Sequence, residues 1–127
     1  MRRAGLAALA VAALLPLQLQ AANEVQVRTA EDLINICAVP DDHPHVEGAR
    51  GFCYGFLSGA ANYHRAIHAG KKGRPLACPP EGGVTRAEAA QLFVAWGRAN
   101  PKYLGEAAVD ALMRFAAATW PCKPAKG

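Results

Sequence analysis

Four cysteines constrain the fold of this 127-residue chain more than any other feature: Cys37, Cys53, Cys78 and Cys122. An even number of cysteines in a small exported chain predicts two disulfides, and four cysteines allow three pairings. The spacings contain no Cys-x-x-Cys, which disfavours a thioredoxin-like redox pair, a zinc ribbon and a c-type haem attachment site. The cysteines are therefore expected to crosslink the fold.

The N-terminal stretch MRRAGLAALAVAALLPLQLQAANE has the pattern of a secretory signal peptide. Two arginines precede an uncharged apolar run from Leu6 to Leu17, and small residues follow at Ala21 and Ala22, where cleavage is expected. The apolar run is shorter than the roughly 20 residues that a membrane-spanning helix needs. We therefore expect residues 1–21 to be removed after export.

The mature part, residues 22–127, is long enough for a single domain of common size. Without Arg2 and Arg3 it keeps 12 basic residues against 10 acidic ones, and this small excess gives little support for nucleic-acid binding. No cysteine precedes Cys37, so the processed N-terminus offers no site for lipid attachment. We expect no membrane anchor.

Apolar spacing and capping residues predict four main helices. Thr29 and Thr85 are suited to cap the first and third of these helices. The expected helices cover about residues 29–37, 46–69, 85–99 and 104–120. The connection 70–84 has four glycines and three prolines, and its length is typical of a functional or a disordered loop. Cys78 in its middle favours the functional interpretation. No strand pattern of useful length appears beyond residues 24–28, so we expect an all-α fold, a compact bundle of four main helices with two disulfides.

The second predicted helix contains a glycine at every fourth position: Gly51, Gly55 and Gly59. Each glycine costs roughly 0.5–1 kcal/mol of helix stability relative to alanine, so some contact should offset the loss. Residues four apart lie nearly in line on a helix, and the three glycines would form a groove for a neighbouring helix. We predict that the first helix packs in this groove, flanked by Phe52, Phe56 and Tyr63.

The predicted disulfide pairs are Cys37 with Cys53 and Cys78 with Cys122. A Cys37–Cys53 bridge needs its Cα atoms only about 4.4–6.8 Å apart, and this is why the first helix is the expected partner of the second. On the chain-entropy model the two bridges contribute about 3 and about 4 kcal/mol, which would offset the cost of the glycines.

Four histidines are the candidates for metal chemistry: His43, His45, His64 and His68. His64 and His68 have the i, i+4 spacing that can bind zinc, but Arg65 stands where a metalloprotease carries its glutamate. We favour a solvated helix face for this pair over a metal site, and no cofactor is expected. Cysteines held in disulfides cannot act as thiolate nucleophiles, so the chain is not expected to be an enzyme.

Lys71, Lys72 and Arg74 give the long loop a local positive charge. A solvated loop is the favoured interpretation, and contact with an acidic partner surface is the alternative. Trp96 and Trp120 are more typical of a core or a dimer contact than of a ligand platform. The last helix is apolar around much of its girth, so it should lie at the centre of the bundle or in a homodimer interface.

Four segments together resemble the Rap/Tai family of periplasmic immunity proteins: DLINIC, GFCYGFLSGAANY, CPPEGGVTRAEAAQLFVAWGRANP and AVDALMRFAAATWPC. The resemblance covers about residues 29–122 in the order and at the distances typical of that family. It implies a helical, disulfide-bonded periplasmic protein that binds a type VI secretion effector, often a peptidoglycan amidase. Binding would occlude the active site of the effector, so the protein itself needs no catalysis.

Two other functions remain as alternatives at this point. A small periplasmic helical protein with a binding or chaperone-like role and no cognate toxin would share the same composition. A metal-handling protein is supported by the four histidines alone.

Overall fold

The computed structural model describes residues 26–70 and 73–124. It contains four α-helices and one short 3₁₀-helix: α1 (Ala30–Cys37), α2 (Val46–His68), α3 (Arg86–Ala99), η1 (Pro101–Tyr103) and α4 (Ala108–Thr119). An isolated bridge, Thr29 with Ala107, is the one β-type pairing in the described part, which has no strand. The predicted all-α fold with four main helices is confirmed. The predicted signal peptide, residues 1–21, lies outside the described residues.

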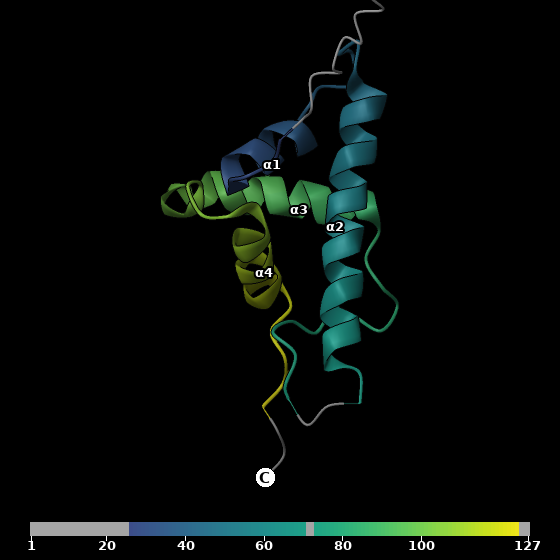
Figure 1. The fold of residues 1–127 in the computed structure, drawn as a ribbon, viewed down its shortest axis with the longest axis vertical. Helices are drawn as coiled ribbons and strands as arrows, with labels where there is room; N and C mark the ends of the chain where they lie inside the picture. The colour runs from purple at the N-terminus through teal and green to yellow at the C-terminus, as the bar shows by residue number, and fades with distance from the viewer. Residues whose placement is uncertain (1–25, 71–72, 125–127) are drawn as a thin grey trace, which may run out of the picture.

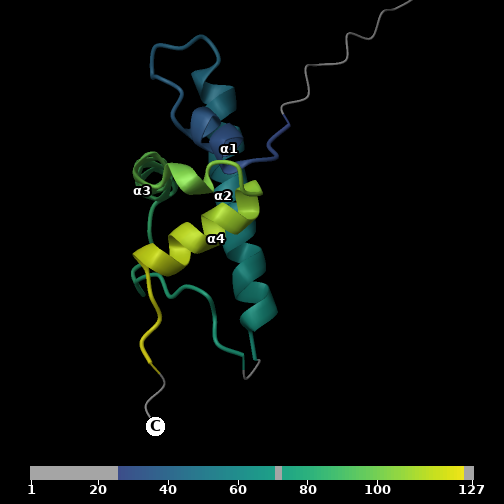
Figure 2. The ribbon, with the colours of Figure 1, turned by 90° about the vertical axis from the view of Figure 1, so that its left-hand side faces the viewer.

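The helices cross one another at the centre of the molecule (Figures 1 and 2). The long helix α2 runs along one side, α3 passes across it, and α1 and α4 lie on the same side of α2. The shortest α-helix, α1, is central, because it packs against α2, α3 and α4. None of the helices in the described part is long and apolar enough to cross a membrane.

All four helices contribute side chains to one hydrophobic core. Its largest fully buried side chains are Phe93, Phe115, Leu33 and Cys53. The rings of Phe93 and Phe115 meet edge to face with their centroids 5.4 Å apart. Trp96 and Trp120 are partly buried against this cluster, as expected for core tryptophans. The core therefore joins α3 and α4 through aromatic contacts.

Thr29 and Asp32 cap the N-terminus of α1 reciprocally. The Asp32 backbone N–H donates to Thr29 Oγ1 (3.2 Å), and the Thr29 backbone N–H donates to Asp32 Oδ2 (2.9 Å). The Arg28 backbone N–H donates to the same carboxylate oxygen (3.0 Å). These N–H groups lower the pKa of Asp32, the Thr29 bond having the largest effect, because they stabilise the charged form.

The last helix begins later than predicted, at Ala108 and not near Leu104. The carbonyls of Leu104 and Glu106 accept hydrogen bonds from the backbone N–H groups of Glu31 (3.0 Å) and Ala30 (2.9 Å). The first N–H groups of any α-helix lack partners within the helix. Residues 104–107 supply partners to α1 and so do not form the first turn of α4.

Both disulfides have the predicted pairing. Cys37–Cys53 joins the end of α1 to α2, with its Cα atoms 5.2 Å apart. Cys78–Cys122 joins the loop after α2 to the segment after α4, with its Cα atoms 4.9 Å apart. The first bridge is partly embedded in the core, because Cys53 is buried, whereas Cys78 is exposed.

The prediction that α1 lies in the glycine groove is wrong. A Cβ atom added at Gly51, Gly55 or Gly59 would meet no described atom within 4 Å. Each of these glycines is two residues from Cys53 or Leu57, the buried residues of α2, and two residues correspond to about 200° around a helix. The side of α2 that carries Cys53 therefore faces the core, and the glycines point away from it.

The close helix contact occurs instead at Gly97 of α3. Gly97 is buried, and a Cβ atom there would overlap the end of the Ile34 side chain of α1. Neighbouring residues of α3 give no hint of this contact in the sequence, since Gly97 is a lone glycine near the end of an amphipathic helix. The contact lets α1 and α3 approach within the core.

Candidate functional site

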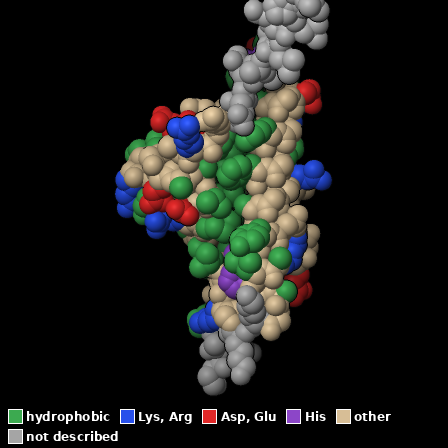
Figure 3. Space-filling model, in the orientation of Figure 1, with side chains coloured by type: hydrophobic (Ala, Val, Ile, Leu, Met, Phe, Trp, Pro, Cys, Tyr) green, Lys and Arg blue, Asp and Glu red, His purple; other side chains and the backbone are tan. Residues whose placement is uncertain are grey.

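The candidate site is the exposed side of α2 that carries the glycines. We call six exposed residues the open face of α2: Gly51, Phe52, Gly55, Gly59, Tyr63 and Ile67. At 100° per residue they share about half of the helix circumference. In the view of Figure 3, hydrophobic side chains gather on the side of α2 toward α1 and α4.

Aromatic side chains on the open face are exposed and partly ordered by their neighbours. Phe52 is 38% exposed and Tyr63 is 69% exposed. The Phe52 ring stacks on Phe56 one turn later, with centroids 6.4 Å apart, and Phe56 packs against the core. Phe52 is thus supported by the core while one side of its ring stays accessible to a partner.

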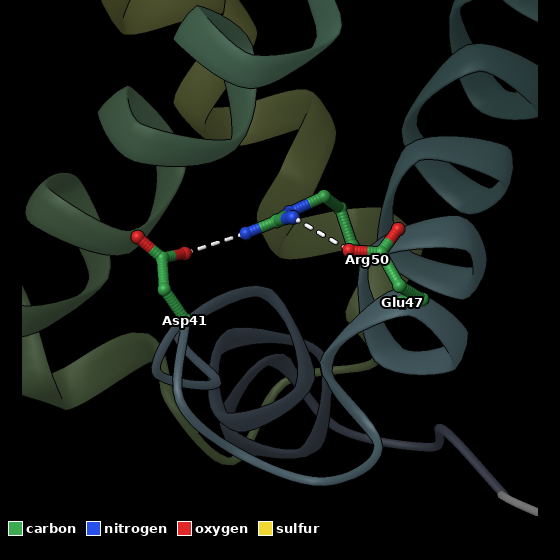
Figure 4. A network of polar contacts seen from close by, with 3 residues as sticks. All are labelled: Asp41, Glu47 and Arg50. Atoms are coloured by element: carbon green, nitrogen blue, oxygen red, sulfur yellow. Dashed lines mark hydrogen bonds and ion pairs between the residues drawn. The ribbon is translucent and has the colours of Figure 1, made fainter.

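Charged residues of α2 lie outside the open face. Arg50, on the side of α2 that faces α1 and α3, pairs with Asp41 (Nη2 to Oδ1, 2.5 Å) and with Glu47 (Nη1 to Oε1, 3.1 Å; Figure 4). The two carboxylate side chains are 93% and 85% exposed, so this network is a surface one. The Asp41 contact joins the loop before α2 to the helix, whereas the Glu47 contact lies within α2.

The cationic loop residues are only partly within the described structure. Lys71 and Lys72 lie outside the described residues. Arg74 is exposed and donates from Nη2 to the backbone carbonyl of Lys123 (2.6 Å). The Cys78 N–H donates to the carbonyl of Trp120 (2.8 Å). The loop therefore runs beside the C-terminal segment, and Arg74 brings its charge there.

The four histidines form two separate pairs. His43 and His45 are exposed in the loop before α2, and His64 and His68 lie near its other end. The intervening helix is roughly 30 Å long, which keeps the pairs apart. Among the residues that the structure describes, no group of three or more His, Cys, Asp or Glu side chains could hold a metal ion.

The interpretation of His64 and His68 as residues of a solvated face needs correction, because both are half-buried. The Leu76 backbone N–H donates to His64 Nε2 (3.1 Å), and His68 Nδ1 lies 2.8 Å from the His64 carbonyl oxygen. Burial, followed by the nearby His68, lowers the pKa of His64. His64 therefore contacts the loop after α2, a contact that the sequence pattern does not reveal.

Two cationic side chains lie over a partly buried aromatic ring, that of Tyr103. Arg114 and Lys102 lie over the Tyr103 ring, 4.5 and 4.8 Å from its centroid. Arg114 also donates to both carboxylate oxygens of Glu106 (3.2 and 3.0 Å), which raises its pKa. Tyr103 stacks on Trp96 with a centroid distance of 5.5 Å. No pattern in the sequence indicates this cluster, which holds η1 against α3 and α4.

Comparison with known proteins identifies one family. The family model described as Rap1a immunity proteins matches residues 29–122. The matched region begins at the N-cap of α1 and ends at Cys122, so it contains all four helices and both disulfides. No curated protein and no solved structure matches the chain.

Proposed function

Because this chain belongs to the Rap1a family of immunity proteins, we propose that it is a periplasmic inhibitor that binds a type VI secretion effector and sterically blocks its active site. The observation that carries this proposal is the family match over the complete disulfide-linked helical fold. The effector class implied by the resemblance is a cell-wall-directed toxin, and a peptidoglycan amidase is the one that we propose. The inhibitor itself is proposed to be non-catalytic.

The fold suits inhibition by occlusion, which requires a surface that is ordered before binding. One disulfide ties α2 at Cys53 to the end of α1, and the other ties the loop after α2 at Cys78 to the segment after α4. A preordered surface loses less conformational entropy on association, so more of the contact energy contributes to affinity. Export to the periplasm, an oxidising compartment, agrees with these disulfides.

We propose the open face of α2 as the surface that contacts the effector. Exposed aromatic residues often dominate the energy of protein interfaces, and Phe52 and Tyr63 are such residues. The glycines beside them leave room for a loop or a helix of the partner to approach the α2 backbone. This assignment also gives the three glycines a role, since contacts among the described residues do not explain them.

The proposal predicts that the gene of a secreted hydrolase adjoins the gene of this chain, because a toxin and its immunity protein must be inherited together, and the inhibition itself is tested with that hydrolase. The hydrolase is directed to the periplasm of a host, with and without co-expression of this chain. We expect lysis without the chain and survival with it, together with a stoichiometric complex of the two purified proteins. Equal lysis in both strains would contradict the proposal.

The binding surface is tested with Gly59→Arg, which adds a large charged side chain to the open face. No described atom lies within 4 Å of a Cβ at Gly59, so the variant should fold. We expect effector affinity to fall by at least about 30-fold, the loss of one interface hot spot. Gly82→Arg adds the same charge at an open glycine in the loop and serves as the matched control.

A second variant removes an anchor without adding charge. Tyr63→Ala deletes an exposed ring, and Leu92→Ala deletes a side chain that is 38% exposed on α3. Weaker binding is expected for Tyr63→Ala alone. If both variants, and also Gly59→Arg, bind the effector as the unchanged protein does, another surface makes the contact.

Lys71, Lys72 and Arg74 are proposed to contact an acidic region of the same effector. Opposite charges at an interface mainly raise the association rate and make it sensitive to salt. Charge reversal by Lys71→Glu with Lys72→Glu should therefore slow association and weaken its dependence on ionic strength. Unchanged association would remove this loop from the interface.

A homodimer of this chain would bury some of the exposed apolar residues. Val109, the most exposed large apolar residue of α4, is 47% exposed. Sedimentation velocity of the isolated protein measures its oligomeric state. A dimer that Gly59→Arg dissociates would assign the open face of α2 to self-association, and a dimer that it leaves intact would place the self-contact elsewhere.

A further inference from the structure

His64 holds the loop after α2 to the end of that helix through a bond that depends on protonation. The Leu76 backbone N–H donates to His64 Nε2 (3.1 Å), so this nitrogen must carry a free lone pair. A doubly protonated imidazole has N–H groups at both nitrogens and cannot accept. The observed contact therefore exists with the neutral ring only, and its remaining proton sits on Nδ1.

This bond connects the loop after α2 to the helix itself. Among the described residues, it is the one hydrogen bond between the last three turns of α2 and residues 73–78. The same loop is attached firmly on its other side, where Cys78 is bridged to Cys122 and Arg74 donates to the Lys123 carbonyl. Breaking the His64 contact would leave the loop attached to the C-terminal segment and remove its hydrogen bond to α2.

We propose that His64 is a pH-sensitive latch, whose neutral ring fastens residues 73–78 to α2 and whose protonation releases them. The loop would remain crosslinked to the C-terminal segment in both states. Protonation of His64 is expected to affect only this end of α2, because the core contacts of the helix at Cys53 and Leu57 lie about two turns or more away. The latch does not depend on the proposed effector.

The charged groups around His64 favour the closed state at neutral pH. From its own helix, His68 faces it with ring centroids 4.5 Å apart, and His68 Nδ1 is bound to the His64 carbonyl. From the loop, Arg74 supplies a positive charge that is directed to Lys123. No carboxylate acts on His64 within the described residues. Partial burial and a second histidine both disfavour the imidazolium and lower the pKa of His64.

The direction of the pH effect follows from this shift. The pKa of His64 in the folded protein lies below that of the same residue in the unfolded chain, so the neutral form stabilises the fold. This contribution is complete above about pH 6.5 and is lost as the pH falls toward the lowered value. The latch is thus closed near neutral pH and opens in acid.

The test measures amide exchange at Leu76 by NMR, corrected for the intrinsic effect of pH, while the His64 ring is titrated in the same sample. We expect Leu76 to exchange about tenfold faster once His64 is protonated, as for loss of one hydrogen bond. His64→Ala should show the fast exchange at every pH. His68→Gln should move the Leu76 transition to higher pH, because it removes one of the two causes of the lowered pKa.

Two results would overturn the latch. One is a Leu76 exchange rate that stays constant while the His64 ring becomes protonated. The other is a pH-dependent transition of the same size in His64→Ala. Amides of the α3 core, such as that of Phe93, provide the reference within each spectrum, since they should stay protected throughout.

Discussion

Ile34 of α1 lies against Gly97 of α3, in the space that a side chain at position 97 would occupy. Both residues are buried, and Ile34 is only 6% exposed. The side chain of Ile34 therefore fills the gap that the missing Cβ leaves. This contact sets how closely the central helix α1 approaches α3.

Gly97→Ala should destabilise the protein although alanine is the better helix former. The new methyl group would force Ile34 out of a close-packed position, at a cost of about 1–3 kcal/mol. The higher helix propensity of alanine offsets up to about 1 kcal/mol of this loss in stability. We expect a net loss of about 1 kcal/mol in the free energy of unfolding, measured by urea denaturation.

Gly55→Ala is the matched control, since a Cβ there meets no described atom within 4 Å. It should raise stability by up to about 1 kcal/mol. Ile34→Val removes the methyl group that obstructs position 97, so Gly97→Ala should cost less in that background. Equal effects of Gly97→Ala in both backgrounds would show that Ile34 is not the obstacle.

The two disulfides should differ in their sensitivity to reductant. Thiol exchange requires access to a sulfur atom, and Cys78 is exposed whereas Cys53 is 1% exposed. We expect a mild thiol reductant to open Cys78–Cys122 first. Timed alkylation followed by peptide mass spectrometry reports the order, and prior opening of Cys37–Cys53 would contradict it.

Stability should fall in acid as Asp32 loses its charge. Its pKa is lowered in the folded protein by N–H groups of Thr29 and Arg28, so the carboxylate stabilises the fold above its unfolded pKa of about 4. This contribution disappears as the pH falls through the lowered value. In urea titrations from about pH 2 to 6, Asp32→Asn should show a weaker pH dependence than the unchanged protein.

Glu31→Gln is the control for this titration, because Glu31 belongs to the same first turn but is not part of the reciprocal cap. It should retain most of the pH dependence. If Glu31→Gln flattened the profile as much as Asp32→Asn did, the general effect of charge at the helix N-terminus would explain it, not the hydrogen bonds of Asp32.

Features with a local cause were predictable from the chain. Thr29 and Thr85 cap helices by accepting hydrogen bonds from N–H groups three residues away, so a short segment of sequence is enough to predict their roles. Gly70 favours the end of α2 because glycine readily adopts the left-handed backbone conformation that follows a helix, and Pro101 favours the end of α3 because proline has no backbone N–H to donate. The start of α4 was not predictable in this way, because the residues just before it bond to another helix. Their carbonyl groups accept hydrogen bonds from backbone N–H groups of α1.

The glycines show where local reasoning fails. A repeat of four residues places Gly51, Gly55 and Gly59 on one stripe of α2, but it does not state whether that stripe faces the core or solvent. The position of Cys53 and Leu57 decides this, and it depends on which side of α2 meets α1 and α3. Phe52 and Tyr63 are exposed for the same reason.

By itself the sequence determined the four helices, the expectation of two disulfides and the resemblance to a family of immunity proteins, because caps, helix breakers and cysteine number act over short distances or are independent of packing. Only the tertiary structure decided that Gly97 and not the glycine stripe meets another helix, that α2 keeps an open face, and that His64 holds the loop. These contacts join residues far apart in the chain, and packing of the whole core selects them from several arrangements that local spacing allows equally.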